Sequence, residues 1–355
     1  MVLHRRRLLG LVRMFAVSGL LAACAAPAPV GPDSEMLEAA RAELGRHLFY
    51  DADLSLDGTM ACATCHEQKN GFAEHNATHP GVTGEPGIRN APGLANVAHR
   101  SSLTWSDPAI GTLEAQAMIP LTGLHPVEMG MARMEAVLVE RLGRKSCYRT
   151  MFASAFPDRA GVIEFATVSA ALAAFERRLV SSDAPYDRFM DGEGTALTDM
   201  QRRGAALFFG AELGCSSCHA GRDFTDATTP LSEPGLAFHS ISSRSDTEDD
   251  DLAASTGDVA SRGRFRTPSL RNASRTAPFL HDGSAATLRD AILAHDATGF
   301  RLPEDGETAA LEAFLASLTD EDFLGRADLA LPVNLCSVDA KAIPSPRDKS
   351  PTSAN

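Results

Sequence analysis

Two short runs of the sequence place a pair of cysteines directly before a histidine, in the order C-x-x-C-H. They are CATCH at residues 62–66 and CSSCH at residues 215–219. Two thiols at this spacing can form thioethers with the two vinyl groups on one edge of a haem, and the next histidine then falls beneath the iron as its proximal ligand. A redox dithiol needs no histidine, and a zinc site would need both pairs to converge. The motifs therefore predict two covalently bound haem c groups.

The residues assigned to these groups are Cys62, Cys65 and His66 for the first haem, and Cys215, Cys218 and His219 for the second. They use four of the seven cysteines in a chain of 355 residues, and a disulfide framework would need many more. Of the other three, Cys24 belongs to the N-terminal segment described below, and the motifs give no role to Cys147 and Cys336. They could form one disulfide or stay buried as small apolar groups, and the sequence leaves both open.

The N-terminus has the pattern of an export signal. Arginines 5–7 and 13 flank a short apolar run, Leu8 to Leu21, that is too short for a stable membrane span. The sequence Leu21-Ala22-Ala23-Cys24 resembles the bacterial lipobox, in which the cysteine is lipidated and becomes the first mature residue. We expect a signal peptide at 1–23, a tether at 24–35 and a periplasmic protein held at the membrane surface by a lipid on Cys24. An ordinary signal peptide with a chance cysteine is the alternative.

The charge balance bears on the partners. The formal net charge is −13, and loss of the four arginines of the signal segment would lower it to −17. This acidity argues against nucleic acid as a partner. It suits an encounter with a basic protein, and equally it serves solubility.

The distribution of apolar residues predicts a mainly α fold with two cytochrome c-like domains, at 36–195 and 196–330, and a tail at 331–355. Helical spacing is found at six places, which are 34–50, 131–142, 162–179, 197–209 (with Thr198 as cap), 287–294 and 308–318. The third of the helices expected in the first domain, 162–179, is long enough to bridge the halves. The Gly-, Asn- and Pro-rich stretch 71–92 predicts an ordered loop wrapped on the first haem.

The positions of the methionines and tyrosines limit which residues could be the sixth ligand of the second iron. No methionine follows Met200 and no tyrosine follows Tyr186. A ligand from the same domain must then be His239, His281 or His295. We favour His295, at the end of the expected helix 287–294.

The first iron has either an open side or one of four histidines as its sixth ligand. The candidates are His75, His79, His99 and His125. An open iron can bind peroxide, whereas an iron with two strong ligands transfers electrons.

Beyond the haem motifs, several segments carry a specific resemblance. They are Gly45 to Phe49, Arg89 to Pro92, Trp105, Gln116 with Pro120, Glu128-Met129, Ala174 to Glu176 and the long run Arg264 to Leu288. With them, residues 38–325 resemble the bacterial di-haem cytochrome c peroxidase and MauG superfamily. The segment Leu103 to Gly130 is most similar to the MbnH-like enzymes, relatives of MauG that oxidise tryptophan on a partner protein.

The resemblance implies roles for residues of both halves. Trp105 matches the residue that relays electrons between the haems, and Glu128 matches a distal carboxylate that moves protons when peroxide is cleaved. Gln116 and Pro120 match residues of the same pocket. An interdomain Ca²⁺ site is implied at Asn90, Thr276 and Pro278.

Two positions depart from the peroxidases. Val82 falls where they have a displaceable distal histidine, which favours an open first haem, and His295 falls where they have methionine and MauG has tyrosine. We therefore expect an enzyme that reacts with H₂O₂ at the first haem and oxidises a side chain of a secreted protein. The alternatives are a peroxidase supplied by a small cytochrome or cupredoxin donor, and a non-enzymatic di-haem electron carrier.

Overall fold

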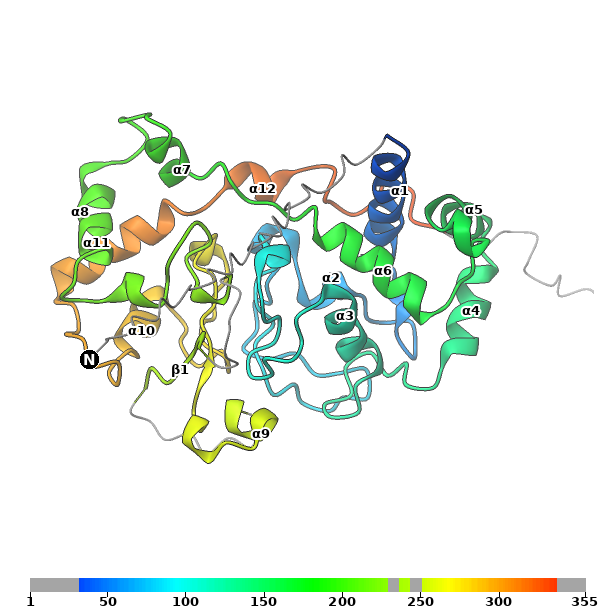
Figure 1. Cartoon of the computed structure of the whole chain (residues 1–355), viewed down its shortest axis with the longest axis horizontal. Helices are drawn as coiled ribbons and strands as arrows, with labels where there is room; N and C mark the ends of the chain where they lie inside the picture. The colour runs from blue at the N-terminus through cyan, green and yellow to red at the C-terminus, as the bar shows by residue number, and fades with distance from the viewer. Residues whose placement is uncertain (1–31, 229–235, 243–250, 337–355) are drawn as a thin grey trace, which may run out of the picture.

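The computed structural model describes residues 32–228, 236–242 and 251–336, which form two lobes side by side (Figure 1). The expected signal peptide and Cys24 lie outside the described residues. Within the described residues, no helix is long and apolar enough to cross a membrane.

The first lobe is built from six helices. They are α1 (Pro32–Phe49), α2 (Cys62–Cys65), α3 (Leu113–Thr122), α4 (Glu135–Gly143), α5 (Ser146–Ala155) and α6 (Phe165–Glu176). The main packing is of α6 against α1 and α3. The α2 helix holds the first cysteine pair.

The second lobe repeats this plan with shorter elements. Its helices are α7 (Pro185–Met190), α8 (Asp199–Phe208), α9 (Leu252–Thr256), α10 (Leu288–Leu293) and α11 (Asp305–Ala316), followed by α12 (Glu321–Gly325). The strands β1 (Phe238–His239) and β2 (Phe265–Arg266) pair antiparallel, with Phe238 opposite Arg266. The second cysteine pair lies in a 3-10 turn, Cys215–Ser217, and the loop after it.

One glycine lets the two principal helices of each lobe approach closely. A Cβ on Gly45 of α1 would lie 1.9 Å from the carbonyl oxygen of Ala171 on α6. In the second lobe a Cβ on Gly204 of α8 would lie 1.9 Å from the carbonyl oxygen of Ala310 on α11. The same helix crossing therefore occurs twice, and neither crossing has room for a side chain at the glycine.

All six expected helices are present, with shifted ends. The helix expected from residue 131 begins at Glu135, because Gly130 and Arg133 take left-handed backbone conformations with φ of 72° and 61°. The α6 helix ends at Glu176 and packs within the first lobe, so the expectation that it bridges the halves was wrong. The α3 and α5 helices were not expected, and α3 contains Pro120, which weighs against a helix in the sequence.

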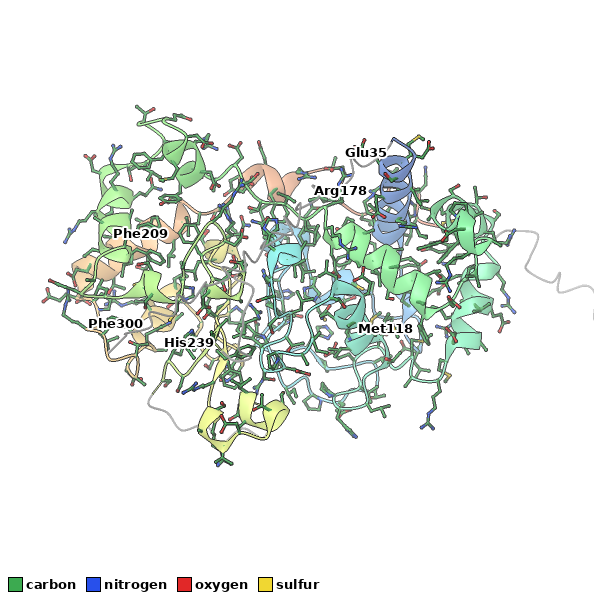
Figure 2. The ribbon with its side chains drawn as sticks, viewed as in Figure 1. Glu35, Met118, Arg178, Phe209, His239 and Phe300 are labelled. Carbon is green, nitrogen blue, oxygen red and sulfur yellow. A yellow bond between two sulfur atoms is a disulfide. The ribbon has the colours of Figure 1, made fainter. Side chains whose placement is uncertain are left out.

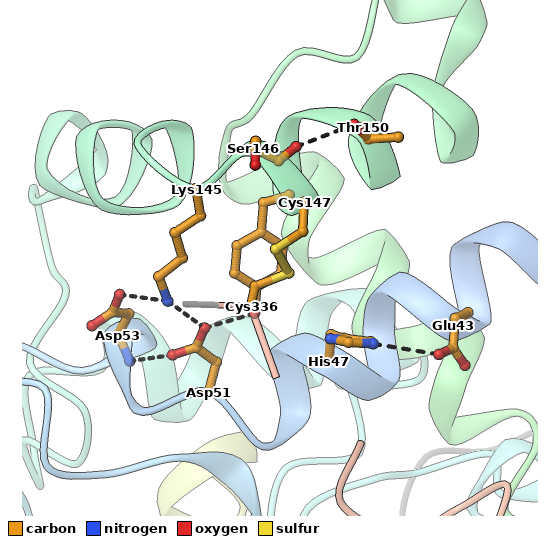
Figure 3. The surroundings of a disulfide bond; sticks show 10 residues. Glu43, His47, Asp51, Asp53, Lys145, Ser146, Cys147, Thr150 and Cys336 are labelled. Atoms are coloured by element: carbon orange, nitrogen blue, oxygen red, sulfur yellow. Dashed lines mark hydrogen bonds and ion pairs between the residues drawn. A yellow bond between two sulfur atoms is a disulfide. The ribbon is translucent and has the colours of Figure 1, made fainter. Parts of the chain in front are cut away.

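The last described segment, 321–336, returns from the second lobe to the first, and we call it the C-terminal strap. The Phe323 ring lies 5.6 Å from the Phe72 ring, and Tyr50 donates a hydrogen bond to the Leu329 carbonyl at 2.9 Å. Cys336 forms a disulfide with Cys147 on α5, beside a cluster of buried charged residues (Figure 3). Of the two states that the sequence left open for these cysteines, the structure has the disulfide.

Candidate functional site

The first cysteine pair lies against the aromatic core of its lobe. His66 follows α2, and its Nδ1 lies 2.8 Å from the carbonyl oxygen of Phe72. Phe72 is buried with a positive φ of 59°, which turns its carbonyl toward the ring. Burial lowers the pKa of His66, so its imidazole is neutral near pH 7. A neutral ring held through Nδ1 leaves Nε2 as the atom that could bind a metal.

Glu128 is placed beside this pair by two backbone contacts. The Met129 amide donates to the Pro120 carbonyl on α3 at 3.0 Å, and the Val82 amide donates to the Glu128 carbonyl at 2.7 Å. Burial raises the pKa of Glu128. Burial first, then the charges of Glu176 and Glu128, raise the pKa of Cys62 to about 12. The structure therefore brings Glu128, the Pro120 end of α3 and the first cysteine pair together.

The four other histidines proposed for the first iron have different surroundings. His75 pairs with Glu67 at 2.7 Å, and His99 pairs with Asp223 at 2.8 Å. His125 is exposed, in a cis peptide bond to Pro126. The Nδ1 of His79 lies 2.7 Å from the Pro80 carbonyl, and the side chain lies near Cys65 and Glu74. Within the described residues, no second histidine ring pairs with that of His66.

The second cysteine pair has a different arrangement. The Nδ1 of His219 lies 3.1 Å from the Phe224 carbonyl, as for His66, but here a second imidazole faces the ring. The rings of His219 and His295 have centroids 6.4 Å apart at an interplanar angle of 54°. Two imidazoles bound to one metal ion at about 2 Å each would place their ring centres about 6 Å apart. The His295 Nδ1 lies 2.8 Å from the Ala291 carbonyl, so its Nε2 is also left to bind.

The other two histidines of the second lobe lie elsewhere. His239 lies on β1 (Figure 2). Its Nε2 is 2.7 Å from Asp226, and Cys218 is close to both residues. Hydrogen bonds to Asp226 and then Cys218 raise the pKa of His239 to about 9. The His281 ring stacks on Phe265 with centroids 3.6 Å apart. Of the three candidates, the geometry favours His295.

Trp105 lies between the lobes and is buried. Its Nε1 donates to the Asn90 carbonyl at 2.7 Å, and the Asn90 amide donates to the His281 carbonyl of the second lobe at 2.9 Å. The Arg266 amide on β2 donates to the Trp105 carbonyl at 2.8 Å. The only tryptophan of the chain is therefore hydrogen-bonded on two sides, in the region where the two lobes meet.

Comparison with known proteins agrees with this arrangement. A sequence profile described as di-haem cytochrome c peroxidase matches residues 39–195. The methylamine utilization protein MauG of Methylorubrum extorquens is 36% identical over 268 residues, which cover 74% of this chain and 70% of MauG. The chain belongs to the di-haem cytochrome c peroxidase and MauG family.

Both named branches of the family are similar to the chain. The cytochrome c551 peroxidase of Pseudomonas aeruginosa is 33% identical over 282 residues, covering 78% of each chain. A crystal structure described as a MauG-like protein associated with microbial copper homeostasis superposes with a TM-score of 0.76 and 36% identity, over 83% of this chain and 93% of that one. The chain is therefore an oxidoreductase with the helical fold of this family.

The residues present fit the two haem c groups that the family implies. All four motif cysteines are free thiols and half-buried, so they are accessible for thioether formation. Burial lowers the pKa of His66, of His295 and of His219, the last to about 4, with His295 adding to the effect at His219. Each lobe thus offers two thiols and a neutral imidazole, and the second lobe offers a further imidazole.

The three residues at which the sequence implied a calcium site, Asn90, Thr276 and Pro278, come from both lobes. The Asn90 Nδ2 donates to the carbonyls of Asn76 and Ala77, which leaves Oδ1 as the atom that could bind an ion. Thr276 and Pro278 lie on either side of Ala277 in the second lobe, and the Ala277–Pro278 peptide bond is cis. The Thr276 methyl lies against the first lobe, 3.4 Å from where a Cβ on Gly71 would be. Asn90, Thr276 and Pro278 thus stay candidates for a calcium site.

Two residues near the site were not singled out from the sequence. Arg266 is buried under Trp105, and Glu176 is a buried carboxyl whose charge reaches Cys62. Both belong to segments that carried the resemblance, Arg264 to Leu288 and Ala174 to Glu176. Only tertiary packing shows which side chain of each segment turns toward the site.

Proposed function

We propose that the chain is an exported di-haem enzyme in which the first site reacts with hydrogen peroxide and the second transfers electrons. The supporting observation is the difference between the two histidines. His219 faces His295 at 6.4 Å, whereas within the described residues His66 faces no second imidazole. A haem attached through Cys62 and Cys65, with His66 as its iron ligand, would keep an open side. A haem attached through Cys215 and Cys218, with His219 and His295 as iron ligands, would be closed.

Peroxide reduction needs two electrons and two protons for each pair of water molecules formed. When bound, the first haem supplies the iron that binds peroxide and the electrons that cleave its O–O bond. Glu128 supplies and accepts protons there, because burial raises its pKa and so favours the protonated carboxyl over its ordinary ionised form. Gln116 and Pro120 on α3 shape the same pocket, and Trp105 carries electrons between the lobes.

The electrons come, in this proposal, from a side chain of a secreted protein. Two observations support the choice. Val82 stands where the peroxidases have a displaceable histidine, and MauG and a MauG-like protein are each 36% identical to the chain. The similarity to the cytochrome c551 peroxidase supports a second candidate, in which a small cytochrome or cupredoxin donates the electrons.

The location of the enzyme is proposed from the sequence. The segment 1–23 would direct export, and a lipid on Cys24 would hold the protein at the membrane surface in the periplasm, with 24–35 as tether. A calcium ion between the lobes, at Asn90, Thr276 and Pro278, belongs to the same proposal.

The test is to add stoichiometric peroxide to the oxidised holoprotein and follow the haem absorption bands. We expect a change in the Soret and near-infrared bands in the wild type. In Glu128→Gln the change should form about 10²–10⁴-fold more slowly. The control Glu140→Gln alters an exposed carboxylate on α4 that pairs with Arg144, and should react as wild type. Bands that ignore peroxide in the wild type would exclude the enzymatic proposal in favour of an electron carrier.

The electron source is tested separately. Rapid repeated turnover with reduced cytochrome c would identify a peroxidase. Slow turnover with that donor, together with a mass change on a secreted partner protein, would support side-chain oxidation.

A further inference from the structure

The positively charged guanidinium of Arg266 lies over the face of the Trp105 ring. The guanidinium carbon of Arg266 lies 5.4 Å from the ring centroid, within the range of a cation–π interaction. Arg266 is 1% exposed, so little water screens the interaction. The two residues are 161 positions apart and come from different lobes.

Backbone contacts hold the guanidinium in place. Its Nε donates to the Thr104 carbonyl at 2.9 Å and its Nη1 to the Thr267 carbonyl at 3.1 Å. Its Nη2 is buried and has no hydrogen-bond partner within residues 32–228, 236–242 and 251–336. No carboxylate forms an ion pair with Arg266 among the residues that the structure describes. Burial, with a smaller effect from the charge of Arg100, lowers the pKa of Arg266 to about 9, and the negative charge of Asp226 acts in the opposite direction. The group therefore remains charged near neutral pH, and carbonyl oxygens alone do not neutralise it.

A fixed cation at this position acts differently on the two redox states of the indole. It attracts the electron-rich face of the reduced ring and repels a ring that has lost an electron. The Trp105 Nε1–H donates to a backbone carbonyl, that of Asn90, which is too weak a base to remove the proton. The oxidised ring would thus keep its positive charge, directly beside that of Arg266.

We propose that Arg266 raises the oxidation potential of Trp105, so that the tryptophan passes electrons between the lobes without itself remaining oxidised. The inference rests on the proposed relay role of Trp105. In each transfer Trp105 loses one electron toward the first site and regains one from the second, and no bond is formed or broken. Arg266 acts through Trp105 and is a positioning residue. Its charge protects the only indole of the chain from irreversible oxidation.

The experiment treats the holoprotein with peroxide and measures oxygen addition to the Trp105 peptide by mass spectrometry. Irreversible damage consumes one peroxide per indole, adding one oxygen atom to the ring and releasing water. Arg266→Gln, which removes the charge, should give about tenfold more oxygenated Trp105 than the wild type. Arg266→Lys, which keeps it, should stay close to the wild type. The control Arg41→Gln removes a cation that lies 5.2 Å from the centroid of the buried Phe156 ring in the first lobe, and it should change nothing.

A second measurement does not depend on peroxide. Because the chain has a single tryptophan, ultraviolet resonance Raman spectra of the untreated holoprotein report on Trp105 alone. The indole bands of the wild type should differ from those of a free tryptophan peptide in the direction produced by a cation on the ring. Arg266→Gln should remove this shift, and Arg41→Gln should retain it. If the glutamine variant fails to fold, the wild-type spectrum still decides whether the charge acts on the ring.

The outcomes separate the inference from the function on which it rests. A wild type whose haem bands ignore peroxide would overturn both. A normal peroxide response with equal Trp105 oxygenation in wild type and Arg266→Gln would overturn the inference alone. So would equal damage in the lysine and glutamine variants, because geometry and not charge would then be responsible. Indole bands matching the free peptide would do the same.

Discussion

At the scale of single residues, the same backbone contact orients both motif histidines, His66 and His219. The carbonyls of Phe72 and Phe224 each accept the Nδ1–H of the nearby imidazole, and both phenylalanines adopt a positive φ to do so. This fixes the tautomer and presents Nε2. The two sites then differ in the side chain that faces the motif histidine, because a second imidazole, His295, faces it only in the second lobe.

Replacement of His295 tests this difference. In His295→Ala we expect the second haem to change from low spin to high spin, because the iron loses its sixth ligand. His295→Met should keep it low-spin and raise its reduction potential. The ferric absorption and electron paramagnetic resonance spectra report the spin state. His239→Ala is the matched control and should leave it unchanged; a low-spin second haem in His295→Ala would contradict the assignment.

Glu176 gives a prediction on pH. Burial raises its pKa to about 8, with Arg177 opposing and Glu114 adding to the shift. The folded protein therefore keeps a proton that the unfolded chain loses above the ordinary value of 4.5. Between these two values the free energy of unfolding falls as pH rises, and above pH 8 this contribution is constant. Below pH 4.5 both states hold the proton, so the penalty is absent.

Glu176→Gln should remove most of that fall, a gain of about 3 kcal/mol at pH 8 and little at pH 4.5. Denaturant unfolding across this pH range measures it. Glu38→Gln, at an exposed carboxylate on α1, is the control and should follow the wild-type curve. Parallel curves for wild type and Glu176→Gln would show that the carboxyl is not held protonated.

At the scale of secondary structure, the glycine crossings decide how close the principal helices come. Gly45→Ala should lower the free energy of unfolding by about 1–3 kcal/mol, because its Cβ would overlap the Ala171 carbonyl. Gly306→Ala on α11 is the control, since nothing lies within 4 Å of its Cβ. It should be neutral or stabilising by up to about 1 kcal/mol through helix propensity. Thermal unfolding of the two variants compares them, and equal midpoints would refute the close crossing.

The elements also show what local sequence signals can and cannot predict. Thr198 was expected to cap a helix, and its hydroxyl accepts the Gln201 amide at the start of α8. The α3 helix was missed because Pro120 interrupts its pattern, although Thr112 caps it in the same way. Local signals identify caps and periodic faces, whereas α3 is stabilised by packing on α6, which no local signal reports.

At the scale of the whole molecule, the pairings that make the site are contacts between distant parts of the chain. The CxxCH spacing is a local signal that the sequence shows directly. Because no methionine follows Met200 and no tyrosine follows Tyr186, the candidates for the second iron's sixth ligand are three histidines. Which of them meets His219 depends on how α10 packs. The stacking of Arg266 on Trp105 depends likewise on the docking of the lobes, which no periodicity in the sequence encodes.

The C-terminal strap ties this docked arrangement together. Gln68 donates to the Arg326 carbonyl at 2.8 Å, and Arg46 donates to the Ala330 carbonyl at 2.9 Å. The Cys147–Cys336 disulfide, with a sequence separation of 189, then closes a covalent loop that contains the second lobe together with α5 and α6 of the first. The strap thus fixes the end of the second lobe's chain to the first lobe.

Removal of that closure should destabilise the protein without altering the haem sites. In Cys147→Ser/Cys336→Ser we expect the free energy of unfolding to fall by about 3–5 kcal/mol, because the unfolded chain without the disulfide loop has a higher conformational entropy. Calorimetry should show a lower melting temperature, while the ferric spectrum and the peroxide response stay as in the wild type. Mild reduction of the wild type provides a control without mutation, since thiols exchange with a disulfide but do not cleave haem thioethers. An unchanged melting temperature in the double variant and in the reduced wild type would mean that the noncovalent strap contacts alone hold the lobes together. A changed ferric spectrum would mean that the disulfide also affects the structure of the first haem site.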